Sequence, residues 1–143
     1  MKRILTIVLT LIIGFLPKLV LADDSLHSTL DQANQNFASA ILAKNIDHLV
    51  GDYTHDACIL APSTPRTCGL EAIRKFWSAV VDSNPKDVKI GTMNVGSTGD
   101  LAYATGTLVI TDVSDNVSSN NYVLVLKDVD GVWKLHLDTW TPN

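Results

Sequence analysis

Residues 121–140 read NYVLVLKDVDGVWKLHLDTW, and this stretch decides the fold. Val, Leu, Tyr and Trp are frequent on both sides of the turn residues Asp128 to Gly131, which is typical of two strands joined by a tight turn. Two similar segments, Val88 to Val95 and Leu101 to Val113, precede it and are also bounded by turn residues. The second half of the chain is therefore predicted to form a four-stranded antiparallel meander.

The residues before this meander have helical periodicity. From Ser25 to Lys44, apolar residues recur every three or four positions, which forms one apolar stripe along a helix. Leu70 to Val80 has the same period, and Asn84-Pro85 ends this second helix. Between the helices, Asp56 to Ala61 and Arg66 to Cys68 are predicted as two short strands of a hairpin. Helices followed by a meander indicate an α+β fold.

The N-terminus has the features of a secretory signal peptide. Met1-Lys2-Arg3 is positively charged, Ile4 to Leu16 is almost wholly apolar, and Val20-Leu21-Ala22 suits a signal peptidase. The alternative is an uncleaved anchor, but the apolar run is shorter than the roughly 20 residues of a membrane-spanning helix. We predict that residues 1–22 are removed and that residues 23–143 form one exported domain, periplasmic or secreted.

The charge balance excludes two classes of partner. The 143 residues include 11 Lys and Arg against 15 Asp and Glu, which gives a formal net charge of −4. Cleavage of the signal peptide would remove Lys2, Arg3 and Lys18 but no acidic residue. Nucleic acids and anionic membrane surfaces attract clustered Lys and Arg. We therefore expect neither of them to bind the mature domain.

Several short motifs carry a family resemblance that covers about residues 28–141. They are Tyr53-Thr54-His55-Asp56-Ala57, Pro62 and Pro65, Gly69 to Trp77, Gly99 to Tyr103, Asp130 to Lys134, and Asp138-Thr139-Trp140. In these motifs the chain resembles the SnoaL-like and ketosteroid-isomerase-like branch of the nuclear transport factor 2-like (NTF2-like) superfamily, in particular its exported members. The resemblance implies a cone-shaped, cystatin-like fold, in which a curved antiparallel sheet wraps around a long N-terminal helix and encloses a pocket.

The resemblance also allows a test for isomerase chemistry. Ketosteroid isomerases use an Asp as general base, and a Tyr and a protonated Asp as oxyanion donors. The resemblance places the base at Ala61, the Tyr at Phe37 and the protonated Asp near Tyr122. Ala cannot accept a proton and Phe cannot donate a hydrogen bond. We expect this catalytic set to be absent, and Phe37, Ala61 and Tyr122 to line the pocket instead.

The last predicted strand carries other polar chemistry. Strand alternation places His136, Asp138 and Trp140 on one face, and the resemblance turns that face toward the pocket. In an apolar pocket, desolvation would raise the pKa of Asp138 and suit it to proton transfer. One interpretation is an acid/base pair of Asp138 and His136 beside Trp140. The other is a buried hydrogen-bonded pair that tethers a helix to the sheet.

Further pocket residues and one cross-link are predicted from the same pattern. Tyr53 lies where the first helical region meets a strand, and Trp77 falls on the apolar stripe of the second helix, so both are expected at the pocket wall. The chain has two cysteines, Cys58 and Cys68, which in an exported protein suggests a disulfide; two separate buried thiols are the alternative. No spacing typical of a metal site or of a cofactor-binding loop is found, so neither is predicted.

Three classes of function remain open. The first is a binding protein whose pocket takes a small apolar or mixed-polarity molecule. The second is a cofactor-free isomerase, lyase or cyclase that uses Asp138 and His136. The third is an interaction module that forms a homodimer through the open face of the sheet. That predicted face comprises Asn121, Val123, Val125 and Lys127, beside Trp133, Leu135, Leu137 and Thr139.

Overall fold

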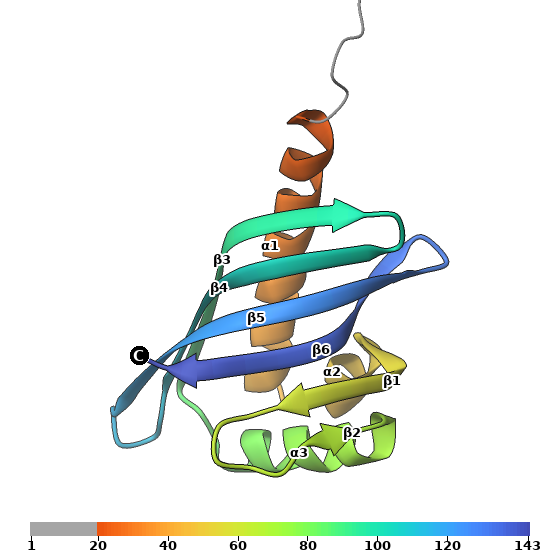
Figure 1. Ribbon diagram of the computed structural model, residues 1–143. Coiled ribbons are helices and arrows are strands. Elements are labelled where there is room, and N and C mark those ends of the chain that lie inside the picture. The colour runs from red at the N-terminus through yellow and green to blue at the C-terminus, as the bar shows by residue number, and fades with distance from the viewer. Residues whose placement is uncertain (1–19) are drawn as a thin grey trace, which may run out of the picture.

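A six-stranded sheet packs against three helices in the computed structural model, which describes residues 20–143, with side chains from Asp24 onward (Figure 1). The helices are α1 (Val20–Leu42), α2 (Ile46–Gly51) and α3 (Leu70–Asp82). The strands are β1 (Tyr53–Leu60), β2 (Thr67–Cys68), β3 (Asp87–Thr98), β4 (Leu101–Thr111), β5 (Val117–Val129) and β6 (Val132–Pro142). The predicted α+β fold is confirmed.

The sheet has the strand order β2-β1-β6-β5-β4-β3. The meander β3 to β6 is antiparallel, as predicted, and β1 and β2 form the predicted hairpin. The fully antiparallel expectation is wrong at one place, because β1 pairs with β6 in parallel. This pairing joins the hairpin to the far end of the meander and closes the lower part of the sheet over α2 and α3 (Figure 1).

The long helix α1 runs along the inner face of the sheet, and its first turns extend past β3 (Figure 1). Its buried residues Leu26, Leu30, Phe37 and Ile41 follow the predicted stripe. Residues 1–19 of the predicted signal peptide lie outside the described residues, and residues 20–22 form the first turn of α1. Within residues 20–143, no helix is long and apolar enough to cross a membrane. Signal cleavage and export stay predictions.

Two β-bulges bend the meander around α1. Opposite β4, Thr92 pairs with Gly106 and Asn94 pairs with Thr105, so the intervening residue of β3 is extra. Opposite β5, Leu135 pairs with Leu126 and Leu137 pairs with Val125, so His136 is the extra residue of β6. A bulge bends its strand and shifts the alternation of side chains by one position. The bulge at His136 therefore decides which residues of β6 point inward.

The turn between β5 and β6 depends on a left-handed backbone. Asp130 and Gly131 have φ values of 54° and 82°, and the Gly131 amide donates to Asp128 Oδ1 at 2.7 Å. Two successive positive φ values are typical of a two-residue turn that matches the twist of antiparallel strands. This turn sets the register of the hairpin from which the fold was predicted.

Replacing Gly131 by Ala is expected to lower the free energy of unfolding by about 1 kcal/mol, because an L-residue is strained at positive φ. The matched control is Gly51→Ala. An added Cβ at either position meets nothing within 4 Å, but Gly51 ends α2 and has no positive φ. Urea unfolding measures both variants, and equal losses at the two positions would contradict the account of this turn.

Candidate functional site

An apolar cavity of about 110 Å³ lies between α1, α3 and the inner face of the sheet. Its walls are mostly aromatic and aliphatic, and they come from two helices and the four strands of the meander, with Asp52 between α2 and β1. The lining residues are Leu30, Ala33, Asn34, Phe37 and Ile41 of α1, Asp52, Trp77 of α3, Ile90 of β3, Leu108 and Ile110 of β4, Tyr122, Leu124 and Leu126 of β5, and Trp133, Leu135, Asp138 and Trp140 of β6. The cavity is thus the pocket that the resemblance implied.

Asp138 is the polar centre of this wall. Its side chain is buried, and Tyr53 Oη donates a hydrogen bond to Asp138 Oδ2 at 2.5 Å. Trp77 Nε1 donates to Tyr53 Oη at 3.2 Å, which extends the chain of hydrogen bonds to α3. In the described part of the chain, the other carboxyl oxygen, Oδ1, has no hydrogen-bond partner. Asp138 therefore keeps one oxygen available at the cavity wall.

Burial changes the acidity of both members of the central hydrogen bond. Burial raises the pKa of Asp138 to about 6, and the hydrogen bond from Tyr53 opposes part of this rise. Burial, followed by the negative charge of Asp138, raises the pKa of Tyr53 well above its usual value. Tyr53 therefore stays protonated and acts as the donor. Asp138 changes its charge close to neutral pH, which suits a group that exchanges protons.

A second polar group lies on the same face of the sheet. Asn34 Nδ2 donates to Tyr122 Oη at 3.1 Å and to Thr92 Oγ1 at 2.9 Å. Tyr122 lies over Gly106, where an added Cβ would come within 2.5 Å of the phenol oxygen. Leu124 pairs with Asp138 across the sheet, so Tyr122 is the diagonal neighbour of Asp138. Such neighbours are about 7–8 Å apart. The wall thus presents two polar groups, on Tyr122 and Asp138, whose separation is about the width of one six-membered ring.

Asp52 is a third titratable residue of the cavity lining. Burial raises its pKa, and the charges of His48 and Lys134 oppose this rise. Its carboxylate lies 3.7 Å from His48 Nε2, so it is held at the rim by α2. Asp52 is half-buried, whereas Asp138 is buried. Of the two carboxyl groups, Asp138 is therefore the one that is more completely removed from water.

The structure contradicts the predicted pairing of His136 with Asp138. Because His136 occupies the bulge, its side chain lies on the outer side of β6. There His136 Nδ1 is 3.0 Å from Thr54 Oγ1 and 3.4 Å from Asp56 Oδ1. The hydrogen bond from Thr54 is the main cause that lowers the pKa of Asp56. His136 is therefore part of a polar cluster on β1 and β6, and the acid/base pair is wrong.

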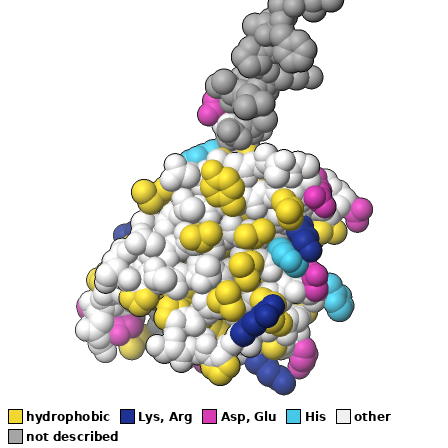
Figure 2. Space-filling view, viewed as in Figure 1, with side chains coloured by type: hydrophobic (Ala, Val, Ile, Leu, Met, Phe, Trp, Pro, Cys, Tyr) yellow, Lys and Arg dark blue, Asp and Glu magenta, His cyan; other side chains and the backbone are white. Residues whose placement is uncertain are grey.

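Because of the same bulge, the predicted assignment of residues to the two faces of β6 is wrong for Trp133 and Leu135. Trp133 and Leu135 line the cavity with Asp138 and Trp140, and so they are not part of the open face. On β5, Val123 is exposed and Val125 and Lys127 are partly exposed, as an outer face requires. Figure 2 shows apolar side chains scattered over this face, with charged groups at its side. Dimerisation through it stays a prediction.

Most of the other predicted pocket residues line the cavity. Phe37, Trp77, Tyr122 and Trp140 do so directly, and Phe37 and Trp77 contact each other edge to face. Tyr53 lies behind the wall and reaches the site through Asp138. Ala61 packs against the core but does not line the cavity, so its placement in the pocket is wrong.

Asn34 is a polar residue that the sequence analysis missed. It falls on the stripe of α1 between Leu30 and Phe37, four residues after the one and three before the other. A polar residue on an apolar stripe is the signal that could have indicated it. Within residues 24–143, no group of three or more His, Cys, Asp or Glu side chains is placed to hold a metal ion.

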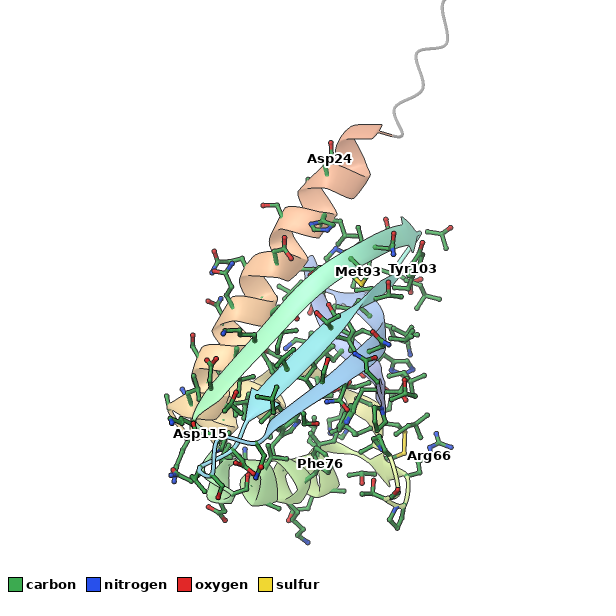
Figure 3. All side chains as sticks on the ribbon, turned by 90° about the vertical axis from the view of Figure 1, so that its left-hand side faces the viewer. Asp24, Arg66, Phe76, Met93, Tyr103 and Asp115 are labelled. Carbon is green, nitrogen blue, oxygen red and sulfur yellow. A yellow bond between two sulfur atoms is a disulfide. The ribbon has the colours of Figure 1, made fainter. Side chains whose placement is uncertain are left out.

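The two cysteines form a disulfide between β1 and β2, away from the cavity wall. Cys58 and Cys68 are directly opposite residues of the two strands. Figure 3 shows the arrangement of side chains around the sheet, with Arg66 at the hairpin and Phe76 on α3. In the chain-entropy model, closing so short a loop stabilises the fold by roughly 2–3 kcal/mol.

Comparison with known proteins supports the fold. A family model described as a SnoaL-like domain matches residues 30–137. No curated protein matches the chain in sequence.

Similarity to solved structures also supports the fold. An NTF2-like protein of unknown function from Pseudomonas putida KT2440 is similar at 15% identity and TM-score 0.71, over 82% of this chain and 87% of that chain. A ketosteroid isomerase-like protein from Erwinia carotovora atroseptica has 15% identity and TM-score 0.66, over 80% and 94%. An NTF2-like protein with a cystatin-like fold from Novosphingobium aromaticivorans has 15% identity and TM-score 0.66, over 84% and 86%. The predicted cystatin-like cone is confirmed.

Replacing Asp138 by Asn is expected to flatten the pH dependence of stability. The pKa of Asp138 is about 6 when folded and close to 3.9 in an unfolded chain, so the folded protein binds the proton more tightly. The free energy of unfolding should therefore fall as pH rises from about 4 to above 6, by about 3 kcal/mol in total. Asn cannot titrate and keeps an acceptor for Tyr53.

Urea unfolding of both proteins between about pH 4 and pH 7 measures this difference. Other titrating groups contribute equally to the two profiles, so the difference isolates Asp138. Parallel profiles for the native protein and the Asn variant would show that Asp138 is not buried in the way described.

Proposed function

Because this chain belongs to the SnoaL-like domain family, we propose that its cavity binds a small molecule and that Asp138 is the polar anchor for that molecule. The observation that carries the proposal is a buried carboxyl group on a mostly apolar wall, one oxygen of which has no hydrogen-bond partner among the described residues. Binding pockets combine apolar walls with a few placed polar groups. Asp138 would orient the ligand, and the aromatic residues would supply most of the contact.

The size of the cavity limits the ligand. An apolar cavity of roughly 150 Å³ takes up a benzene ring, whereas sites for drug-sized molecules have volumes of roughly 300–1,000 Å³. The cavity of about 110 Å³ suits a single ring or a short branched chain. The ligand would carry one hydrogen-bonding group for Asp138 Oδ1 and a second within reach of Tyr122.

Catalysis by Asp138 is the second candidate. A carboxyl group whose pKa is about 6 can take up or release a proton near neutral pH. Tyr53 holds the carboxyl in place and stays protonated, so Asp138 alone would move the proton. This supports a cofactor-free isomerase, lyase or cyclase without His136.

Two single-ring probes of opposite character test the binding proposal. Benzylamine is a cation that needs the ionised carboxylate, whereas cyclohexanone only accepts hydrogen bonds and needs the protonated acid. With a pKa of about 6 for Asp138, benzylamine should bind about tenfold more tightly at about pH 7.5 than at about pH 5, and cyclohexanone should show the opposite trend. Asp138→Asn should remove both trends. Titrations followed by nuclear magnetic resonance measure the affinities.

Ala33 offers a way to block the cavity without changing its chemistry. Ala33 is exposed and also lines the cavity, which places it at the mouth. Ala33→Phe should weaken both probes at least tenfold. Gln32→Phe is the matched control, because Gln32 is an exposed neighbour on α1 outside the cavity lining. If neither probe binds, or if the two Phe variants behave alike, the proposed site is wrong.

The catalytic candidate has its own measurement. If Asp138 removes protons from carbon, the native protein should accelerate deuterium exchange at the carbons beside the carbonyl of cyclohexanone in heavy water near pH 6, where both the protonated acid that holds the ketone and the ionised carboxylate that removes a proton are populated. Asp138→Asn should return the exchange to the rate in buffer alone. Binding of cyclohexanone without faster exchange would leave the protein as a binding protein only.

A further inference from the structure

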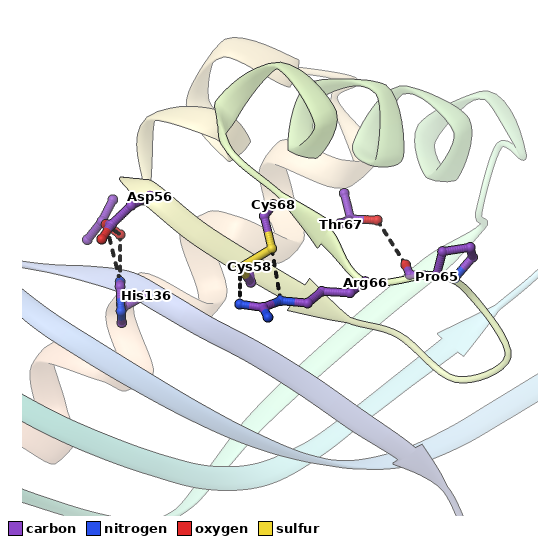
Figure 4. The surroundings of a disulfide bond; sticks show 8 residues. Asp56, Cys58, Pro65, Arg66, Thr67, Cys68 and His136 are labelled. Carbon is purple, nitrogen blue, oxygen red and sulfur yellow. Dashed lines mark hydrogen bonds and ion pairs between the residues drawn. A yellow bond between two sulfur atoms is a disulfide. The ribbon is translucent and has the colours of Figure 1, made fainter.

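The disulfide of the β1–β2 hairpin has a cation placed directly on it. Arg66 Nε donates to Cys68 Sγ at 3.1 Å, and Arg66 Nη2 donates to Cys58 Sγ at 3.2 Å. Figure 4 shows the guanidinium beside the sulfur–sulfur bond, with one contact to each sulfur. Arg66 precedes Cys68 by two residues, and its side chain runs along the hairpin to reach both sulfur atoms. A purely structural cross-link does not require this contact.

The charge of Arg66 is not neutralised by an acid. In the described part of the chain, Arg66 takes part in no salt bridge, whereas Arg74 on α3 pairs with Asp47 at 2.7 Å. Asp56, two residues before Cys58 on β1, accepts a hydrogen bond from Thr54. It also contacts His136 (Figure 4). The full positive charge of Arg66 therefore acts on the two sulfur atoms.

The two sulfurs differ in access. Cys58 is buried in β1, whereas Cys68 is exposed. Cys68 also lies two residues before the start of α3, a helix of 13 residues whose N-terminal end favours negative charge. An incoming thiolate reacts with the sulfur that it can reach, and a guanidinium or a helix N-terminus stabilises the thiolate that is released.

We propose that the Cys58–Cys68 disulfide is a thiol–disulfide exchange site, with small anionic thiols as its co-reactants and Arg66 as the group that stabilises the thiolates. The site lies outside the cavity, and its chemistry does not depend on the ligand proposed above.

The exchange takes place in two balanced steps. A co-reactant thiolate attacks Cys68 Sγ, a bond forms between these two sulfurs, and the bond to Cys58 breaks with its electron pair left on Cys58 Sγ. Arg66 Nη2 holds that thiolate. A second co-reactant thiolate then attacks the first co-reactant sulfur and releases Cys68 as a thiolate beside Arg66 Nε. Two thiols are oxidised to one disulfide, and the protein disulfide is reduced to two thiols.

The folded chain can undergo this exchange because other contacts hold the hairpin. The Gly69 amide donates to Ala57 O at 2.9 Å, which joins β1 to the start of α3 without the disulfide. Ile59 of the hairpin strand β1 and Ile73 of α3 are fully buried. Reduction is therefore expected to leave the core in place.

Replacing Arg66 by Gln tests the role of the charge. Negatively charged glutathione and positively charged cysteamine serve as two reductants of opposite charge, and alkylation followed by mass spectrometry measures the rate of thiol release. With glutathione, Arg66→Gln should slow reduction about tenfold. With cysteamine the loss should be smaller, so the ratio of the two rates should fall. Arg66→Lys, which keeps a positive charge, should recover part of the rate with glutathione.

Arg74→Gln is the matched control, because it removes the same charge from the same region without touching the disulfide. It should leave the ratio of the two rates unchanged. In urea, where the hairpin is unfolded, all variants should be reduced at the same rate. The proposal is overturned if Arg66→Gln and Arg74→Gln behave alike, or if the native protein is reduced only as fast as it unfolds.

Discussion

The hydrogen bond from Tyr53 to Asp138 is the interaction on which the site depends. It joins β1, early in the chain, to β6, which ends it, and Trp77 connects the same group to α3. A buried carboxyl group without a partner costs several kcal/mol, so this bond makes an acidic residue tolerable in an apolar wall. The parallel pairing of β1 with β6 brings the two residues together.

The bulge at His136 is the second requirement, because it turns Asp138 inward. Without the extra residue, strict alternation would place Trp133 and Leu135 on the opposite face from Asp138. With it, two large apolar residues and one acid share the cavity wall, and His136 meets Thr54 and Asp56 on the other side. One inserted residue therefore sets both the composition of the cavity and the polar cluster outside it.

The elements of the fold were predictable because their periodicity is clear. The stripe of α1 and the strand segments around the Asp130-Gly131 turn predicted the architecture, and the family motifs indicated the cone. The bulge was not predictable in this way, since β6 carries apolar residues at both alternations and either face could have been buried. Tyr53 was predicted in the pocket, but its bond to Asp138 depends on the pairing of β1 with β6, which local pattern does not reveal.

Direct titration of the Asp138 side chain tests the account most simply. Carbon-13 nuclear magnetic resonance follows the carboxyl carbon of this one residue, which Asp138→Asn identifies by the loss of its signal. The account predicts a pKa of about 6, raised by burial. Removal of the Tyr53 hydroxyl in Tyr53→Phe should raise it further, since that hydrogen bond lowers it. A pKa near 4 in the native protein, as in a solvated carboxyl group, would contradict the buried anchor at the cavity wall.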